Sequence, residues 1–213
     1  MKINQALFEE TLRVKVNILQ MRTANNPLKS IMVTSANHGE GTSTLVVNLA
    51  FAFALGDKAR VLLVDANIRR PSLHKLFDLE RKNGFLDYIS GRIEMNEGIK
   101  TTLFPNLKVM TAGLQADDNS LSAFNAISKD TRNLLERDFD HVLYDTAPVN
   151  IYPDTLMSAA LANAVILVIQ AEKTRWPAVN KTKENLQAVG AHILGGVLNR
   201  RKRIVPRIIY KRF

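Results

Sequence analysis

Short apolar runs alternate with longer, mostly apolar segments along this chain. Runs rich in Val, Ile and Leu are typical of parallel strands that are buried on both faces of a sheet. We expect such strands at residues 31–34, 60–66, 107–110, 140–145, 164–169 and 192–198. We expect helices at residues 45–55, 71–77, 84–91, 121–137, 154–162 and 178–189, and one of about fifteen residues near the start of the chain. This alternation predicts a doubly wound α/β fold with a mostly parallel sheet flanked by helices.

The chain is expected to divide into an N-terminal helix, one α/β domain and a short tail. The polar, proline-ended loop 23–27 follows the first helix, so we place the boundaries at 1–22, 23–199 and 200–213. Residues 115–120 read as a polar loop inside the domain. A length of 213 residues with 46% apolar content is enough for one sizeable core.

A glycine-rich turn, Gly-Glu-Gly-Thr-Ser-Thr at residues 39–44, separates the first predicted strand from an apolar helix. In this context, main-chain N–H groups and a helix N-terminus converge on an anion, usually a phosphate. The phosphate-loop pattern G-x-x-x-x-G-K-[ST] has Ala36 at its first position, Gly41 at its second glycine and Ser43 at its magnesium-binding hydroxyl. Thr42 occupies the position of the lysine. A plain tight turn without a ligand is the alternative.

Two carboxylates end other predicted strands. Asp65 ends the strand at 60–66 and Asp145 the strand at 140–145, and ligands of open α/β sheets bind beyond such strand ends. Loop amides, a hydroxyl, carboxylates and a cation are the set that a magnesium nucleotide needs. The alternative is that both carboxylates cap helices or pair with arginines. We expect Arg69 and Arg70 to form a solvated pair rather than to replace the lysine, and His38 to be exposed.

Three segments resemble the Walker A, Walker A′ and Walker B boxes of the bacterial tyrosine kinases: residues 39–44, 61–71 and 144–148. The resemblance continues through residues 195–200. It implies a P-loop NTPase fold related to the MinD/ParA ATPases, and a role in capsule or exopolysaccharide synthesis. It also implies ATP or ADP with Mg²⁺ as ligand, and a membrane partner that controls polysaccharide chain length.

The resemblance also implies roles for individual residues. Asp65 and Asp145 would be catalytic, and with Ser43 they would hold Mg²⁺. Asn199 resembles the asparagine that reads adenine. Residues around the phosphates would be Gly39, Glu40, Gly41, Thr42, Ser43 and Thr44.

Three departures from the family pattern indicate a pseudokinase. Thr42 cannot neutralise charge on a transferred phosphoryl group, and losing one such contact typically costs about 3–4 kcal/mol of transition-state stabilisation. Asn67 replaces the second acid of the Asp-x-Asp pair, and Tyr210 is the single tyrosine of a tail where the family has a phosphorylated cluster. The alternatives are an active tyrosine autokinase and a MinD-like positioning ATPase.

Composition narrows the location and the partners. No cysteine and no histidine pair with ligand spacing is present, which excludes disulfides and argues against a zinc site. The start of the chain lacks the apolar block of a signal peptide and no apolar run approaches 18 residues, so we expect a cytoplasmic protein. The membrane partner that the resemblance implies would place it at the inner face of the plasma membrane.

The net charge of +9 is concentrated at the C-terminal end, where residues 200–213 carry seven positive charges and no acid. The tail could adsorb to anionic lipid, dock on a membrane partner or remain a disordered, solubilising end, and we rank nucleic acid last. Glu10 and Arg13 partly match the Glu-x-x-Arg-x-x-Arg motif of ring-forming homo-oligomers, with Val16 in its third place.

Overall fold

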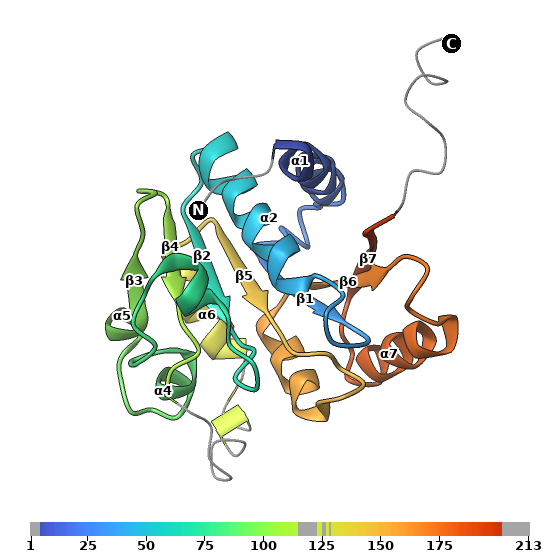
Figure 1. Ribbon diagram of the computed structural model, residues 1–213. Coiled ribbons are helices and arrows are strands. Elements are labelled where there is room, and N and C mark those ends of the chain that lie inside the picture. Colours follow the sequence, from blue (N-terminus) through green and yellow to red (C-terminus); the bar gives the residue numbers. More distant parts are fainter. Residues whose placement is uncertain (1–4, 115–122, 125–126, 128, 202–213) are drawn as a thin grey trace.

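A mostly parallel sheet forms the centre of the protein (Figure 1). The computed structural model describes residues 5–114, 123–124, 127 and 129–201. Among these residues the sheet has seven strands in the order β3-β4-β2-β5-β1-β6-β7, and only β3 pairs antiparallel. The strands are β1 (Ser30–Ser35), β2 (Val61–Asp65), β3 (Ile99–Thr101), β4 (Leu107–Met110), β5 (His141–Asp145), β6 (Ala164–Gln170) and β7 (Ile193–Asn199). The predicted fold class is therefore confirmed.

Helices cover both faces of this sheet (Figure 1). The helices α1 and α2 lie on one face, and α4, α6, α7 and a 3₁₀ helix, η2, lie on the other. The helical elements are α1 (Gln5–Gln20), α2 (Thr42–Gly56), α3 (Leu73–Phe77), α4 (Phe85–Ile89), α5 (Met95–Gly98), α6 (Lys129–Arg137), η2 (Pro153–Leu161) and α7 (Trp176–Ala188). None of the helices in the described ranges is long and apolar enough to cross a lipid bilayer.

Two predicted helices differ from the observed elements, and two observed elements were not predicted. The helix expected at 154–162 is the 3₁₀ helix η2, and α5 with the short strand β3 was not predicted. The helix expected at 121–137 is observed as α6 only from residue 129, while residues 121–122, 125–126 and 128 lie outside the described part. The loop expected at 115–120 lies there too.

The helix that follows the glycine-rich turn is buried along most of its length. Residues 45–54 of α2 are all buried, because the sheet lies beneath them and α1 covers them from outside. The α1 side chain of Lys15, itself buried, donates a hydrogen bond to the Ala52 carbonyl (3.2 Å) and pairs with Asp57 (Nζ–Oδ1 2.6 Å). These contacts attach α1 to the last turn of α2.

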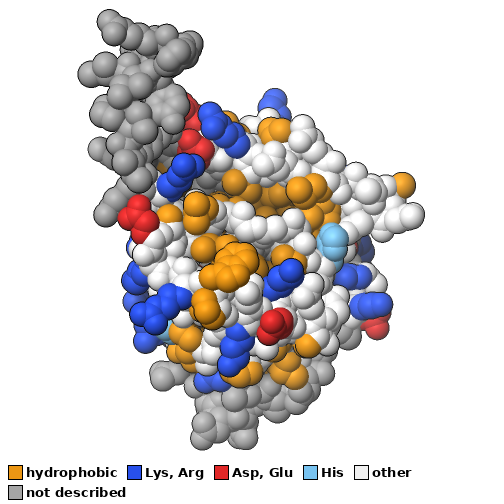
Figure 2. All heavy atoms as spheres, turned by 90° about the vertical axis from the view of Figure 1, so that its right-hand side faces the viewer, with side chains coloured by type: hydrophobic (Ala, Val, Ile, Leu, Met, Phe, Trp, Pro, Cys, Tyr) orange, Lys and Arg blue, Asp and Glu red, His pale blue; other side chains and the backbone are white. Residues whose placement is uncertain are grey.

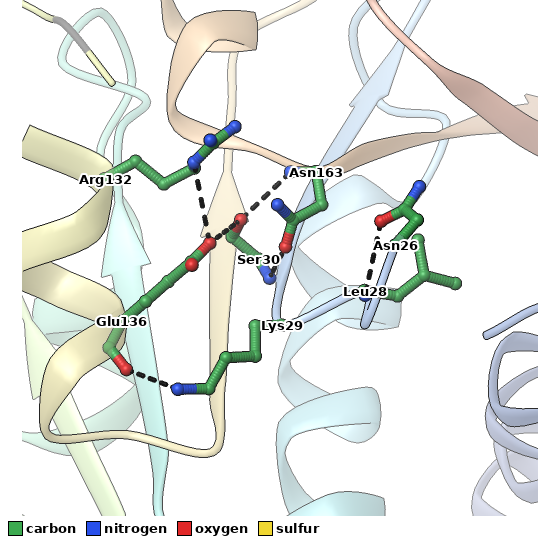
Figure 3. A network of polar contacts seen from close by, with 7 residues as sticks. All are labelled: Asn26, Leu28, Lys29, Ser30, Arg132, Glu136 and Asn163. Carbon is green, nitrogen blue, oxygen red and sulfur yellow. Dashed lines mark hydrogen bonds and ion pairs between the residues drawn. The ribbon is translucent and has the colours of Figure 1, made fainter. Parts of the chain in front are cut away.

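A polar network fixes the amino-terminal end of the sheet (Figure 3). Ser30 and Asn163 exchange two hydrogen bonds of 2.9 Å, which join the start of β1 to the residue before β6. The Ser30 hydroxyl also donates to Glu136 of α6, and Lys29 donates to the Glu136 carbonyl (2.6 Å). This end of the strands is thus occupied by structural contacts, and the loops with chemically active residues lie at the opposite, carboxyl-terminal end.

One face of the molecule exposes apolar side chains. Figure 2 shows them gathered across the side that carries β7 and α7, with Lys and Arg side chains around them. Exposed hydrophobic residues of these two elements include Trp176, which is 70% exposed, and Leu198, which is 56% exposed. β7 is also one of the two edge strands of the sheet, at the end opposite β3.

Candidate functional site: the carboxyl ends of β1, β2 and β5

The turn between β1 and α2 has the backbone conformation of an anion-binding loop. Gly39 and Gly41 have φ angles of 77° and 99°, in the left-handed region that glycine tolerates best. The first hydrogen bond of α2 runs from the Leu45 N–H to the Gly41 carbonyl (3.0 Å). The N–H groups of residues 42–44 precede this ladder and are therefore available to a ligand at the helix N-terminus.

The side chain of Glu40 supports the loop from inside the protein. It is only 2% exposed, and its carboxylate accepts hydrogen bonds from the Ala36 N–H (3.1 Å), the Asn37 side-chain amide (3.0 Å) and the Thr174 hydroxyl (2.5 Å). Glu40 could therefore meet a nucleotide only through its main chain. Thr174 had no place in the sequence argument, although its position just after β6, at a strand's carboxyl end, is the signal that could have found it.

Asn199, at the end of β7, contacts the same loop. Its side-chain amide donates to the Glu40 carbonyl (2.8 Å), and its side-chain oxygen accepts from the Arg200 N–H (2.8 Å). A Cβ atom at Gly41 would lie 2.1 Å from the Asn199 amide nitrogen, so residue 41 must be glycine for this contact to exist. Both ends of the Asn199 side chain are thus bonded within the protein here.

The two predicted carboxylates lie side by side. Asp65 and Asp145 are register partners on the neighbouring strands β2 and β5, and Asp145 is also the register partner of Val33 on β1. Both carboxylates are fully buried. The sheet order therefore brings them next to the loop that follows β1.

Asp65 is bonded to the turn that follows its own strand. One carboxylate oxygen accepts from the N–H groups of Ser72 and Leu73 (3.0 Å each), and the other from that of Asn67 (3.3 Å). Burial raises the pKa of the Asp65 carboxyl to about 6, although these N–H groups and the charge of Arg81 act to lower it. The sequence left open whether Asp65 binds a ligand or caps a helix, and these contacts are those of a residue that caps α3.

Asp145 has no such partners. Neither of its carboxylate oxygens accepts a hydrogen bond of ordinary length and angle from the described residues, and the Ser43 hydroxyl is the donor that lies close to it. Burial, and then the nearby charge of Asp65, raise the pKa of the Asp145 carboxyl well above its ordinary value, while the neighbouring Ser43 hydroxyl acts to lower it. A buried carboxylate that lacks such hydrogen bonds is an unusual and unfavourable arrangement, and a bound cation would relieve it.

The residues here fit a magnesium ion. Two carboxylates and the Ser43 hydroxyl offer the hard oxygen ligands that Mg²⁺ prefers, and the orphaned Asp145 oxygens are the observation that supports the fit. Within the described ranges no cluster of three or more His, Asp or Glu side chains could hold a metal. An ion here would thus need further ligands from phosphate and water, as Mg²⁺ in nucleotide sites usually does.

The two positions at which this chain departs from the charged residues of the family pattern, 42 and 67, carry neutral side chains. Thr42 is the first residue of α2 and is half-buried, and Thr44 beside it is exposed. Asn67 lies in the turn after β2, where its side-chain oxygen accepts from the Arg70 N–H (3.1 Å). Asn67 thus shapes the turn that carries the two arginines.

Aromatic and charged contacts join the loops around the site. Arg69 pairs with Asp154 (Nη2–Oδ2 3.3 Å) and its guanidinium lies 5.4 Å from the ring centre of Tyr152. The Tyr152 ring meets His38 of the glycine-rich loop edge to face, with 5.5 Å between ring centres. Arg69 and Arg70 are both exposed, as expected, but Arg69 also has an ion-pair partner, and His38 is half-buried rather than exposed. The ring and ion-pair contacts across these loops were not predicted.

Other sequence predictions fall elsewhere. Tyr210 and residues 202–213 of the basic tail lie outside the described residues. Arg13 and Glu10 form an exposed ion pair within α1 (Nη1–Oε2 3.8 Å), and Val16 is 48% exposed. These residues are remote from the strand ends that carry the site.

Comparisons with known proteins agree with this arrangement. A family model described as an AAA domain matches residues 28–193. The putative tyrosine-protein kinase CapB of Staphylococcus aureus is 31% identical over 199 residues, which are 93% of this chain and 86% of that protein. The crystal structure of the chimerical protein CapA2B2 has a TM-score of 0.82 at 29% identity, covering 92% of this chain and 85% of that one.

A more distant match extends the comparison of folds. The septum site-determining protein MinD of Pyrococcus horikoshii, complexed with Mg-ADP, has a TM-score of 0.65 at 23% identity, covering 86% of this chain and 76% of that one. At this identity the match shows a shared fold.

Proposed function

Because this chain belongs to the AAA domain family and, within it, to the bacterial tyrosine-protein kinases, we propose that it binds ATP or ADP with Mg²⁺ at the carboxyl ends of β1, β2 and β5. We further propose that phosphoryl transfer is impaired and that the protein regulates exopolysaccharide or capsule biosynthesis as a pseudokinase. The observation that carries the proposal is Asp145, a buried carboxylate that accepts no hydrogen bond of ordinary geometry from the described residues and lies next to the Ser43 hydroxyl at the glycine-rich loop.

Each residue has a separate role in this proposal. The main chain from Gly39 to Thr44 surrounds the phosphates, with Glu40 holding the loop in shape from beneath. Ser43, Asp65 and Asp145 hold Mg²⁺, which when bound neutralises phosphate charge. Since three N–H groups already bind Asp65, Asp145 is the stronger candidate for direct contact with the ion.

Asn199 would read adenine only if its present bonds rearrange. Its amide now donates to the Glu40 carbonyl, and its oxygen accepts from the Arg200 N–H. We therefore propose that Asn199 contributes to nucleotide binding mainly by holding the glycine-rich loop in place.

The absence of a lysine supports the impairment of catalysis. Thr42 offers a hydroxyl where transfer needs a positive charge, and the loss of one preorganised contact lowers rates by roughly 10²- to 10³-fold. Asn67 removes a further acidic group from the same end of the sheet. Binding depends on main-chain N–H groups that are present whatever the residue at position 42, so binding and transfer are separable.

The cellular setting is proposed from the family. We propose a cytoplasmic protein at the inner face of the plasma membrane, which works with a membrane polysaccharide co-polymerase and can form homo-oligomers. The basic tail from residue 200 would attach it to anionic lipid or to that partner. Liposome cosedimentation of the full chain and of a chain lacking residues 200–213 tests this part, and equal binding would remove the tail from the proposal.

Calorimetric titration with ATP and ADP, with and without Mg²⁺, tests the main proposal. We expect Mg²⁺-dependent binding by the unaltered chain and tyrosine phosphorylation far below that of an ordinary kinase. No binding of either nucleotide would refute the site. Phosphorylation at ordinary kinase rates, lost in Asp145→Ala, would instead establish the active autokinase.

The variant Thr42→Lys provides a matched gain-of-function test. If the loop is intact apart from its lysine, this change should tighten ATP binding by about 10-fold or more. Unchanged affinity in the folded variant would show that more than the lysine has been lost.

A further inference from the structure

A nucleotide in the proposed site would bring several negative charges to a loop that has no lysine. The loop itself contributes only main-chain dipoles and hydroxyl groups, because residues 39–44 include no cation. The turn after β2 adjoins the site, since β2 and the loop-bearing β1 lie on either side of β5. That turn carries two adjacent arginines, Arg69 and Arg70.

Arg69 already has its partners. It forms an ion pair with Asp154, whose side chain is 16% exposed, and its guanidinium lies over the ring of Tyr152. The same Tyr152 ring contacts His38. Arg69 is therefore neutralised, and its contacts hold the turn after β2 against the glycine-rich loop.

Arg70 is different. Arg70 is exposed, and its main-chain N–H donates a hydrogen bond to the side-chain oxygen of Asn67 (3.1 Å). No carboxylate of the described residues forms an ion pair with its guanidinium, whereas Arg69 has Asp154. Its positive charge, after burial, lowers the pKa of His38. The geometry agrees: the neighbouring Arg69 lies over Tyr152, whose ring contacts His38, so the turn that carries Arg70 lies beside the glycine-rich loop.

We propose that Arg70 binds the terminal phosphate of the nucleotide from the β2 side of the loop, supplying the positive charge that Thr42 cannot. This inference rests on the proposed function and concerns binding, not transfer. A guanidinium is suited to it, because its planar donors bind phosphate oxygens in pairs and it stays charged at all relevant pH values. Asn67 favours the arrangement, since a neutral amide anchors the Arg70 main chain without offering a competing carboxylate.

Fluorescence-detected titration with ATP, ADP and AMP tests the inference in the full chain. Arg70→Ala should weaken ATP binding by about 10-fold or more, ADP binding less, and AMP binding little, because only the outer phosphates lose a charged partner. Arg70→Lys should keep most of the ATP affinity. Arg60→Ala is the control, since it removes the same charge at the other end of β2, where Arg60 pairs with Asp140.

A double variant separates this role from a structural one. If Arg70 and a lysine at position 42 do the same work, Thr42→Lys should tighten ATP binding more in Arg70→Ala than in the unaltered chain, so that the two changes are not additive. Equal loss of ATP and AMP binding in Arg70→Ala, or an equal gain from Thr42→Lys in both backgrounds, would overturn the inference and leave the nucleotide site unaffected. Failure of the unaltered chain to bind ATP would overturn both proposals.

The His38 ring gives a readout that needs no nucleotide. In a proton NMR titration the pKa of His38 should rise in Arg70→Ala and stay unchanged in Arg60→Ala, because Arg70 is the cation that lowers it. An unchanged His38 pKa in Arg70→Ala would show that the guanidinium does not face the loop, and would overturn the inference independently.

Discussion

Replacing Asp145 by asparagine should stabilise the protein at high pH while abolishing its response to Mg-ATP. Asp145 is fully buried and accepts no hydrogen bond of ordinary geometry from the described residues, so its ionised form opposes folding. Asparagine keeps the shape of the side chain and removes the charge. A residue retained for ligand binding at the expense of stability should behave in this way.

Asp65 on the adjacent strand gives the scale of the effect. A rise of its pKa from 3.8 to about 6 corresponds to about 3 kcal/mol of folding free energy lost above pH 6. Burial raises the pKa of the Asp145 carboxyl in the same direction, and the Asp65 value serves as the scale for the pair. The new amide lacks partners as well, which takes back about 1–2 kcal/mol. We expect a net gain of about 1–2 kcal/mol, or roughly 2–8 °C in Tm for a chain of this size.

The sign of the pH dependence distinguishes this explanation from others. The folded-state pKa of Asp145 is raised, so the folded protein holds a proton that the unfolded chain has released, and stability falls as pH rises above the unfolded pKa of 3.8. The gain in Asp145→Asn should therefore appear at pH 8 and vanish at pH 5.

Thermal unfolding at both pH values, with and without Mg-ATP, measures the effect. Asp140→Asn, five residues before Asp145 on the chain, is the control. The hydrogen bond from Arg60 lowers the pKa of Asp140 to about 2, and losing this exposed pair should destabilise the protein by at most about 1 kcal/mol. A lower Tm of Asp145→Asn at pH 8, or undiminished stabilisation by Mg-ATP, would refute the reasoning.

Three further predictions concern buried polar side chains. Glu40→Ala should destabilise the protein by about 2–4 kcal/mol and weaken ATP binding, because the Thr174 hydroxyl and the Ala36 N–H lose their acceptor. Denaturant unfolding and ATP titration measure the two effects, and unchanged ATP affinity would contradict the role of Glu40 in holding the loop. Lys15→Ala should release α1 to limited proteolysis with a loss of about 1–3 kcal/mol, whereas Asp57→Ala, at the exposed end of the pair, should lose less. Burial lowers the pKa of His141 to about 4, so the unfolded chain binds a proton more readily than the folded protein, and the free energy of unfolding should fall by about 3 kcal/mol between pH 6.5 and 4. His141→Gln should reduce this pH dependence in an acid-unfolding series. An unchanged pH dependence in the variant would contradict the assignment to His141.

The sheet could be predicted from sequence because burial on both faces leaves a direct signal. The strands β1, β2, β5 and β6 are apolar along most of their length and end in a polar residue. The short β3 could not be found in this way, since three half-exposed residues give no pattern. Strand ends also predicted which loops would meet, because parallel strands in one sheet share a carboxyl edge.

The direction of individual side chains could not be read from a motif. Glu40 lies inside the phosphate-loop pattern, yet its carboxylate points inward to Thr174, which is 134 residues away in the chain. Arg69 and Arg70 are neighbours in sequence, but Asp154 binds only one of them, across 85 residues. Such assignments depend on which loop faces which, and spacing within a motif carries no information about that.

The bond from Asn199 to the Glu40 carbonyl has a consequence for biosynthesis. The glycine-rich loop that would hold phosphate is translated early, but Asn199, which bonds the Glu40 carbonyl of this loop, is translated 159 residues later as the last residue of β7. A nascent or truncated chain that stops short of that residue carries the glycine-rich turn without the contact that fills the space above Gly41. Nucleotide binding would then begin only after the ribosome has released β7 and this strand has joined the sheet.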